Sequence, residues 1–284
     1  MSRKLHIITF CIVFLFSVTT LISACAFSHN NTLSEKNNKA IVIEALDGIT
    51  PETVKEIEQI VTVTQKHFAE KTDMALETAV TIVLTPTRKA YIGEVISRFN
   101  LSELEAERVA KGTDALSGNH LIIVNNSGIP TIRQKTFLLV HEITHFYQRQ
   151  IAGPQAGTVK WLLEGIADKI GAQIVSEQGY FTMAEYKNNW QNGLGLATHK
   201  PKLSELITSD GWSTSLSQYG SPLTYKTAGC AVLFLTEQIE EKKVFSYFTR
   251  LKKGESPESA FQNTFGMSMS DFMSHYENLI RKAS

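Results

Sequence analysis

The chain has 284 residues, of which 43% are hydrophobic and 20% are charged, a composition typical of a globular protein and too apolar for a disordered one. Lysine plus arginine and aspartate plus glutamate both number 28, so the formal net charge is zero. This balanced charge does not indicate a nucleic-acid surface, and no run of basic residues stands out along the chain. We therefore expect no nucleic-acid partner.

The N-terminus has the pattern of an export signal. Arg3 and Lys4 precede an apolar stretch from Leu5 to Ile22, and small residues lead up to Cys25. The sequence ISAC that ends at this cysteine resembles a bacterial lipobox, in which the cysteine becomes the lipid-bearing first residue of the mature protein. We therefore expect a signal peptide over residues 1–24 and an exported cell-envelope lipoprotein, held at the outer membrane or cell surface by a lipid on Cys25. An uncleaved membrane anchor is the alternative, and it also places the rest outside the cytoplasm.

The rest of the chain is expected to form one folded domain. Residues 25–39 are polar and rich in Asn and Ser, which predicts a flexible tether after the lipidated cysteine. Residues 40–284 then form a single domain with two lobes, about 40–150 and 151–284. Cys230 is the only cysteine of this domain and lies in an apolar run, so we expect a buried thiol and no disulfide.

Periodicity in the sequence predicts an α+β protein. Alternating or β-branched runs predict strands, and apolar residues at helical spacing predict helices. The predicted strands are 40–46, 78–85 and 120–125. The predicted helices are 51–70, 102–110, 131–150, 159–176, 202–208, 225–241, 243–252, 257–264 and 269–282. The first half is thus mixed α/β and the second half helical. We also expect the strand 120–125 to be a sheet edge, at which an extended peptide could add as a strand; an edge strand that binds no ligand is the default alternative.

A metal-binding motif lies on the helix predicted over 131–150. In HEITH, His141 and His145 are four residues apart, so their directions on a helix differ by only about 40° and both imidazoles can reach one metal ion. Zinc in a catalytic site takes three protein ligands and leaves a fourth position for water. Glu142, next to the first histidine, can lean over that water.

The third ligand is predicted on the following helix. A metzincin would carry a histidine six residues after His145, but that residue is Ile151, which excludes this class. Glu164, in the sequence WLLEGIAD, has eighteen residues between it and His145. Two helices joined by a loop rich in Gly and Pro can bring this carboxylate beside the two imidazoles.

The HExxH motif followed by a glutamate in an E-G-x-A context resembles the gluzincin metallopeptidases. HEITHFYQ together with LLEGIAD is similar to the bacterial peptidase-MA-like family and to the basic secretory protein family, and both families stay open. The resemblance implies a zincin-like fold, with a mixed N-terminal lobe that holds a small sheet and the active-site helix, and a mostly helical C-terminal lobe. It also implies His141, His145 and Glu164 as zinc ligands and Glu142 as the general base.

Asp168 is the candidate partner of a metal-binding histidine. It lies four residues after Glu164, one helical turn away on the same face, and a metal-bound imidazole usually donates its other N–H to a carboxylate or carbonyl. Thermolysin-like gluzincins carry an aspartate at the same offset, which supports this role by resemblance. A solvated charge on an exposed helix face is the alternative.

Tyr225 is the candidate donor to the oxyanion that forms when water attacks a carbonyl. It is predicted at the start of the helix YKTAGCAVLFL, where related gluzincins often place a catalytic tyrosine, and a phenol donates at neutral pH without being charged. Tyr219 and His199 compete for this role, and Tyr225 could equally be a packed aromatic residue.

The remaining histidines and tryptophans carry no comparable pattern. His67 and His275 lie on predicted amphipathic helices, where we expect them at the surface or half-buried. Trp190 and Trp212 are expected to pack or to line the cleft.

The expected function is therefore that of a zinc metallopeptidase, a gluzincin with the pattern HExxH-x18-E. A peptide or protein would be the substrate, and zinc-bound water activated by Glu142 would hydrolyse the peptide bond. Two alternatives stay open: a zinc hydrolase of a non-peptide amide or ester, and an inactive zincin-fold lipoprotein that acts as a binding module.

Overall fold

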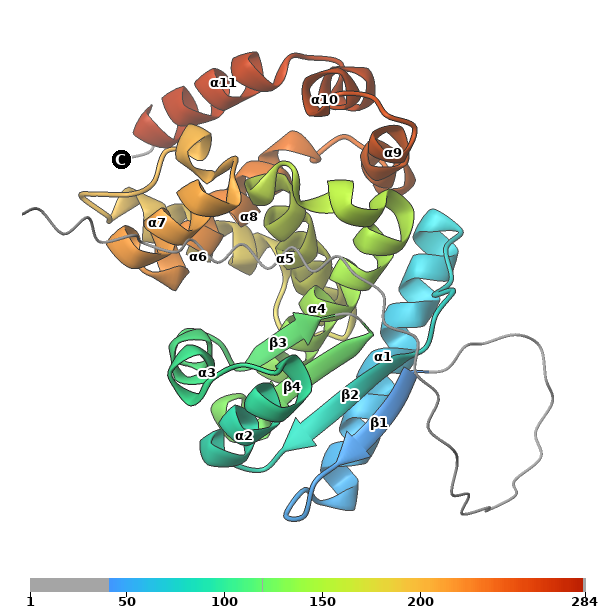
Figure 1. Ribbon diagram of the computed structural model, residues 1–284. Coiled ribbons are helices and arrows are strands. Elements are labelled where there is room, and N and C mark those ends of the chain that lie inside the picture. The colour runs from blue at the N-terminus through green and yellow to red at the C-terminus, as the bar shows by residue number, and fades with distance from the viewer. Residues whose placement is uncertain (1–40, 119, 283–284) are drawn as a thin grey trace, which may run out of the picture. The chain divides into compact units, whose positions relative to one another are not determined.

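The computed structural model describes residues 41–118 and 120–282, so the predicted signal peptide, Cys25 and the predicted tether lie outside the described residues. Within these ranges the chain is an α+β protein, in which a four-stranded sheet and its helices are followed by a helical second half (Figure 1). No helix in the described ranges is long and apolar enough to cross a bilayer.

The sheet is mixed and has the strand order β1-β2-β4-β3. The strands are β1 (Ile41–Ala45), β2 (Val80–Thr85), β3 (Ala115–Gly118) and β4 (Leu121–Asn125). β2 pairs in parallel with β1 and with β4, whereas β3 pairs antiparallel with β4. β4 therefore lies inside the sheet, and the expectation that 120–125 forms an edge is wrong. The edge beside it is β3, whose sequence ALSG contains no β-branched or aromatic residue and so gave no strand signal.

Alternating residues of the central strands pack on the two faces of the sheet. Ile82 and Ile122 point to one face and belong to the large core, which α1 (Pro51–Thr72) and α4 (Ile132–Ala152) also enter. Val83 and Ile123 point to the other face. There they pack in a smaller core with residues of α2 (Arg88–Phe99) and α3 (Glu103–Ala110). α2 was not predicted as a helix, and its C-cap residue Asn100 has a left-handed backbone conformation.

The second half of the described chain is helical (Figure 1). Its helices are α5 (Lys160–Glu177), α6 (Met183–Gly195), α7 (Ser209–Tyr219), α8 (Ser221–Leu235), α9 (Glu241–Lys252), α10 (Pro257–Phe265) and α11 (Met269–Lys282). Short 3-10 helices cover Asn126–Gly128, Gly153–Gly157 and Leu203–Leu206. α6 and α7 were not predicted, because Asn, Ser and Gly, which are poor helix formers, are frequent in their sequences.

α8 begins and ends earlier than predicted. Pro222 lies in its first turn, where a missing N–H and a fixed φ are favourable, so the helix begins at Ser221 and not at Tyr225. Tyr225 consequently lies in the second turn. Thr236 follows the last helical residue, and the segment predicted to continue to residue 241 leads instead into α9.

Two helices carry the sequence motifs: a cap fixes the start of α4, and packing on α8 fixes α5. Thr131 caps α4 in a reciprocal arrangement with Gln134, which explains why the helix begins there. α5 packs tightly on α8 at Gly165, where a Cβ atom would lie only 2.5 Å from the carbonyl oxygen of Ala228. The glycine of the E-G-x-A sequence is thus required by the close approach of the two helices.

Candidate metal centre

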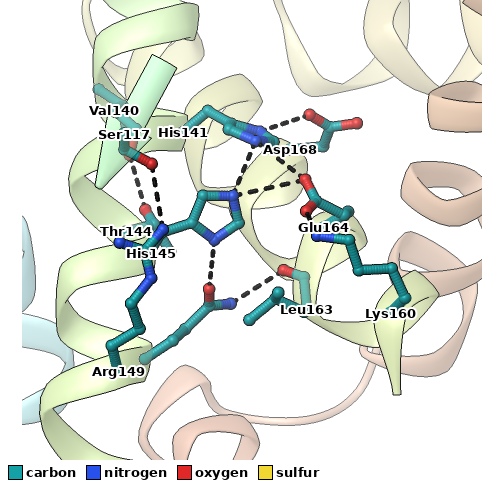
Figure 2. A network of polar contacts seen from close by, with 11 residues as sticks. Ser117, Val140, His141, Thr144, His145, Arg149, Lys160, Leu163, Glu164 and Asp168 are labelled. Atoms are coloured by element: carbon teal, nitrogen blue, oxygen red, sulfur yellow. Dashed lines mark hydrogen bonds and ion pairs between the residues drawn. The ribbon is translucent and has the colours of Figure 1, made fainter. Parts of the chain in front are cut away.

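The structure brings together the three residues predicted to bind a metal. α4 supplies His141 and His145, α5 supplies Glu164, and all three side chains are buried. The two histidine Nε2 atoms are 3.1 Å apart, and Glu164 Oε2 lies 3.2 Å from Nε2 of His141 and 3.4 Å from Nε2 of His145 (Figure 2). The three atoms therefore form a nearly equilateral triangle.

The outward nitrogens of both imidazoles are held by buried acceptors (Figure 2). Nδ1 of His141 lies 2.8 Å from Asp168 Oδ1, and Nδ1 of His145 lies 2.7 Å from Gln148 Oε1. The Gln148 amide nitrogen donates to the carbonyl of Leu163 at 2.9 Å, which orients its oxygen toward the histidine. Since both acceptors can only accept, both Nδ1 atoms carry hydrogen and donate it. In the neutral imidazoles the Nε2 atoms then carry lone pairs.

This arrangement fits a tetrahedral metal ion. Nε2 of His141, Nε2 of His145 and one carboxylate oxygen of Glu164 lie close together, and a cation stabilises such a group, either as a proton on His141 or as a metal ion between the three atoms. With metal–ligand distances of 2.0 to 2.1 Å, the ligands of tetrahedral zinc lie about 3.3 Å from one another. The observed separations of 3.1, 3.2 and 3.4 Å match this value. The donor set of two imidazoles and one carboxylate is also one that zinc binds.

The charges of the cluster also favour a cation. Burial lowers the pKa of His141, but its hydrogen bonds with Asp168 and Glu164 outweigh burial and hold this pKa well above its usual range. Burial raises the pKa of Glu164, yet the charge of Lys160 and the two histidines hold it well below its usual range. Burial raises the pKa of Asp168. The anionic form of Glu164, which a metal ligand requires, is thus the favoured one.

Glu142 differs from the other carboxylates of the site because nothing in the described ranges binds it. Its side chain is only 8% exposed, and its carboxylate makes no hydrogen bond or ion pair with another described residue. Burial raises the pKa of Tyr225 and lowers that of Arg149; the charge of Glu142 adds to the first shift and partly offsets the second. The Glu142 carboxylate therefore lies within electrostatic reach of Tyr225 and is available to a ligand.

The structure places Tyr225, one of the three candidate oxyanion donors, beside the group formed by the two histidines and Glu164. Its ring centroid lies 6.0 Å from that of His141 and packs edge-on at 5.0 Å against Trp212. Burial and the charges of Glu164, Asp168 and Glu142 raise the pKa of Tyr225 well above its usual range, so the phenol keeps its proton. Tyr219 and His199 instead line a separate cavity bounded by α8 and α11.

The edge strand β3 is tied to the helix that carries the histidines. Arg149 of α4 donates to the carbonyl of Gly118 at 3.2 Å and to the Ser117 hydroxyl at 3.1 Å. Its guanidinium also lies over the ring of Phe146. These contacts connect the sheet edge with the C-terminal part of α4.

Two residues of the site, Gln148 and Lys160, were not singled out from the sequence. Gln148 and Lys160 could have been found, because they lie three residues after His145 and four residues before Glu164, the spacings at which helical side chains meet. Lys160 Nζ lies 2.5 Å from Glu164 Oε1. Trp212 was expected to pack or to line the cleft, but it lies on α7, a helix that was not predicted, so its contacts with Lys160 and Tyr225 had no sequence signal.

Comparison with known proteins adds no assignment to this geometry. No protein-family model matches the chain, and no curated protein matches it.

Proposed function

We propose that this protein is a zinc-dependent peptidase with a zincin-like fold. The observation that carries the proposal is the close approach of two imidazole nitrogens and one carboxylate oxygen, together with a buried carboxylate, Glu142, that has no partner among the described residues. The first group suits a metal ion and the second suits a base. The gluzincin resemblance of the two sequence motifs supports the same assignment.

The composition of the donor set favours a catalytic metal over a structural one. Structural zinc sites have four protein ligands, whereas catalytic sites have three and keep one position for water or substrate. In the described ranges, His141, His145 and Glu164 are the one group of this kind, and it has three members. A structural site would also have no use for a carboxylate such as that of Glu142.

The proposed mechanism assigns a proton transfer to Glu142. Bound zinc would act as a Lewis acid and lower the pKa of water toward about 7. Glu142 takes the proton of the water that attacks the scissile carbonyl and delivers it to the leaving amine. Burial without a hydrogen-bond partner leaves both oxygens of this carboxylate free for the transfer.

The other residues of the site orient the reacting groups. Tyr225 donates its phenolic hydrogen to the oxyanion, a role suited to a group whose pKa is held well above neutrality. Asp168 and Gln148 fix the histidine rings so that both Nε2 lone pairs face inward.

The experiment that tests this proposal is elemental analysis combined with a peptide-library assay. We expect about one zinc per chain, lost in Glu164→Ala, while Glu142→Gln keeps its zinc and its fold but loses activity by a factor of about 10²–10⁴. Absence of bound or restorable zinc would contradict the metal centre. Full activity of Glu142→Gln would contradict the assignment of the base, and cleavage of amides or esters but of no peptide would contradict the substrate class.

We also propose, from the sequence alone, that the protein is exported and anchored by a lipid on Cys25. In cells that process lipoproteins, the wild type is expected in the membrane fraction and Cys25→Ala in the soluble fraction. Mass spectrometry of the mature N-terminus checks this result, and an unmodified Cys25 would contradict it.

A further inference from the structure

The two oxygens of Glu164 have different surroundings (Figure 2). Oε2 faces the Nε2 atoms of His141 and His145 at 3.2 and 3.4 Å. Oε1 points away from them and accepts a hydrogen bond from Lys160 Nζ at 2.5 Å. The carboxylate is thus divided between the metal-binding triangle and a single ammonium group.

Lys160 is itself held in place from two sides. It is the first residue of α5, and its backbone N–H donates to the carbonyl of Ile207 at 2.7 Å. Its ammonium lies 5.9 Å from the ring centroid of Trp212, which is buried. The side chain is 24% exposed, so the Lys160–Glu164 pair is screened on most sides by protein. These contacts restrict the ammonium to the vicinity of Oε1.

The stability of α5 does not explain a lysine at this position. The N-terminus of a helix carries partial positive charge, so a cation in the first turn is unfavourable. A Lys that precedes Glu by four residues is also the weaker orientation of the two possible ion pairs. The benefit of Lys160 must therefore be sought at the carboxylate that it contacts.

We propose that Lys160 is a positioning residue that makes Glu164 a one-oxygen ligand. By occupying Oε1, the ammonium leaves only Oε2 for the metal, an inference that rests on the metal centre of the proposed function. A carboxylate can bind a metal through one or both of its oxygens. Through one oxygen, the protein supplies three ligand atoms and keeps a position for water, whereas a second oxygen would compete for that position.

Cobalt(II) substitution of the purified full chain tests this role, because four-coordinate cobalt absorbs visible light more strongly than five-coordinate cobalt. We expect Lys160→Met to lose absorbance, as Oε1 becomes free to bind the metal, and to lower kcat by about 10- to 100-fold. Lys160→Arg is the matched control. It keeps a cation and a donor, and its spectrum should stay like that of the wild type.

An unchanged cobalt spectrum in folded, metal-loaded Lys160→Met would overturn the role of Lys160 and leave the peptidase proposal intact. The same spectral loss in Lys160→Arg as in Lys160→Met would also overturn it. If Lys160→Met does not fold, a crystal structure of the zinc-loaded wild type decides. One Glu164 oxygen on zinc and the other on Lys160 supports the proposal, and both oxygens on zinc refutes it. A wild type that binds no metal would refute the proposed function itself.

Discussion

Two groups of histidine and carboxylate side chains within the described ranges are built differently, and the histidines of both are buried. In the proposed metal centre, the Nε2 atoms of His141 and His145 face each other at 3.1 Å. In the second group, His67 of α1 has a carboxylate at each ring nitrogen: Glu177 at 3.2 Å from Nδ1 and Glu241 at 2.9 Å from Nε2. The residue types are the same, but only the first group has donor atoms that converge.

The second group contains its own counter-charge. Burial lowers the pKa of His67, but the hydrogen bonds to Glu177 and Glu241 outweigh it and raise this pKa to about 9. The protonated ring donates from both nitrogens and so connects α1, α5 and α9. The placement of the donor atoms, and not the residue types, therefore distinguishes the proposed metal site from the ion pairs of His67.

The largest difference is expected in metal content. His141→Ala removes one of three ligands and should abolish zinc binding, whereas His67→Leu should keep about one zinc per chain because no ligand atom is changed. Elemental analysis after dialysis against buffer without metal checks both variants. Loss of zinc from a folded His67→Leu protein would contradict the assignment of zinc binding to the first group alone.

The second difference between the two groups is expected in their contribution to the free energy of unfolding. His67→Leu leaves the buried carboxylate of Glu241 without its partner, and breaking a buried pair in this way costs about 3–5 kcal/mol. Urea denaturation at pH 6 should therefore show a lower free energy of unfolding than in the wild type, with circular dichroism as the check on the folded state. A cost below about 1 kcal/mol, typical of an exposed pair, would contradict the structural role.

The pH dependence of the free energy of unfolding tests the structural role of His67 separately. Because the pKa of His67 is about 9 in the folded state and about 6.5 in the unfolded state, its contribution is complete below pH 6.5 and is lost as the pH rises through 9. The contribution amounts to about 3 kcal/mol at most. Denaturation curves of the wild type should shift between pH 6.5 and 9, whereas His67→Leu should lack this component. Equal pH dependence in both proteins would exclude His67 as its source.

The smallest of these effects is expected outside the ligand triangle. Asp168→Ala and Gln148→Ala each free one imidazole from its acceptor and should weaken zinc affinity by about 10- to 100-fold. Competition with a chelator measures the affinity, and His67→Leu, with unchanged affinity, is the control. Wild-type affinity in both alanine variants would show that the rings need no such partner.

Local geometry explains which parts of the site could be predicted from sequence. Spacings of four residues put His141 beside His145 and Asp168 beside Glu164 on single helices, whatever the rest of the fold. Burial of His67 could not be predicted, because its partners lie 110 and 174 residues further along the chain. The expectation that it lies at the surface or half-buried was wrong.

The limits of sequence patterns are visible in the fold as well. The strands with β-branched runs and the apolar α5 were predicted near their observed positions, because propensity and burial agree there. β3 and α7 are rich in small and polar residues, and their structure is imposed by their neighbours. Since α7 carries Trp212, the contact of Trp212 with Lys160 and Tyr225 could not be predicted from the sequence.

The glycine that follows Glu164 restricts how the two sides of the site can move. At Gly165, α5 lies directly against the backbone of Ala228 and the branched side chain of Val232 in α8, so this junction is tightly packed and stiff. Glu164 is adjacent to this junction, and Tyr225 lies three residues before Ala228, the residue that Gly165 contacts. Movements that admit or release a substrate are therefore expected to carry the ligand and the tyrosine together, as parts of one rigid body, and to take their flexibility from elsewhere in the chain.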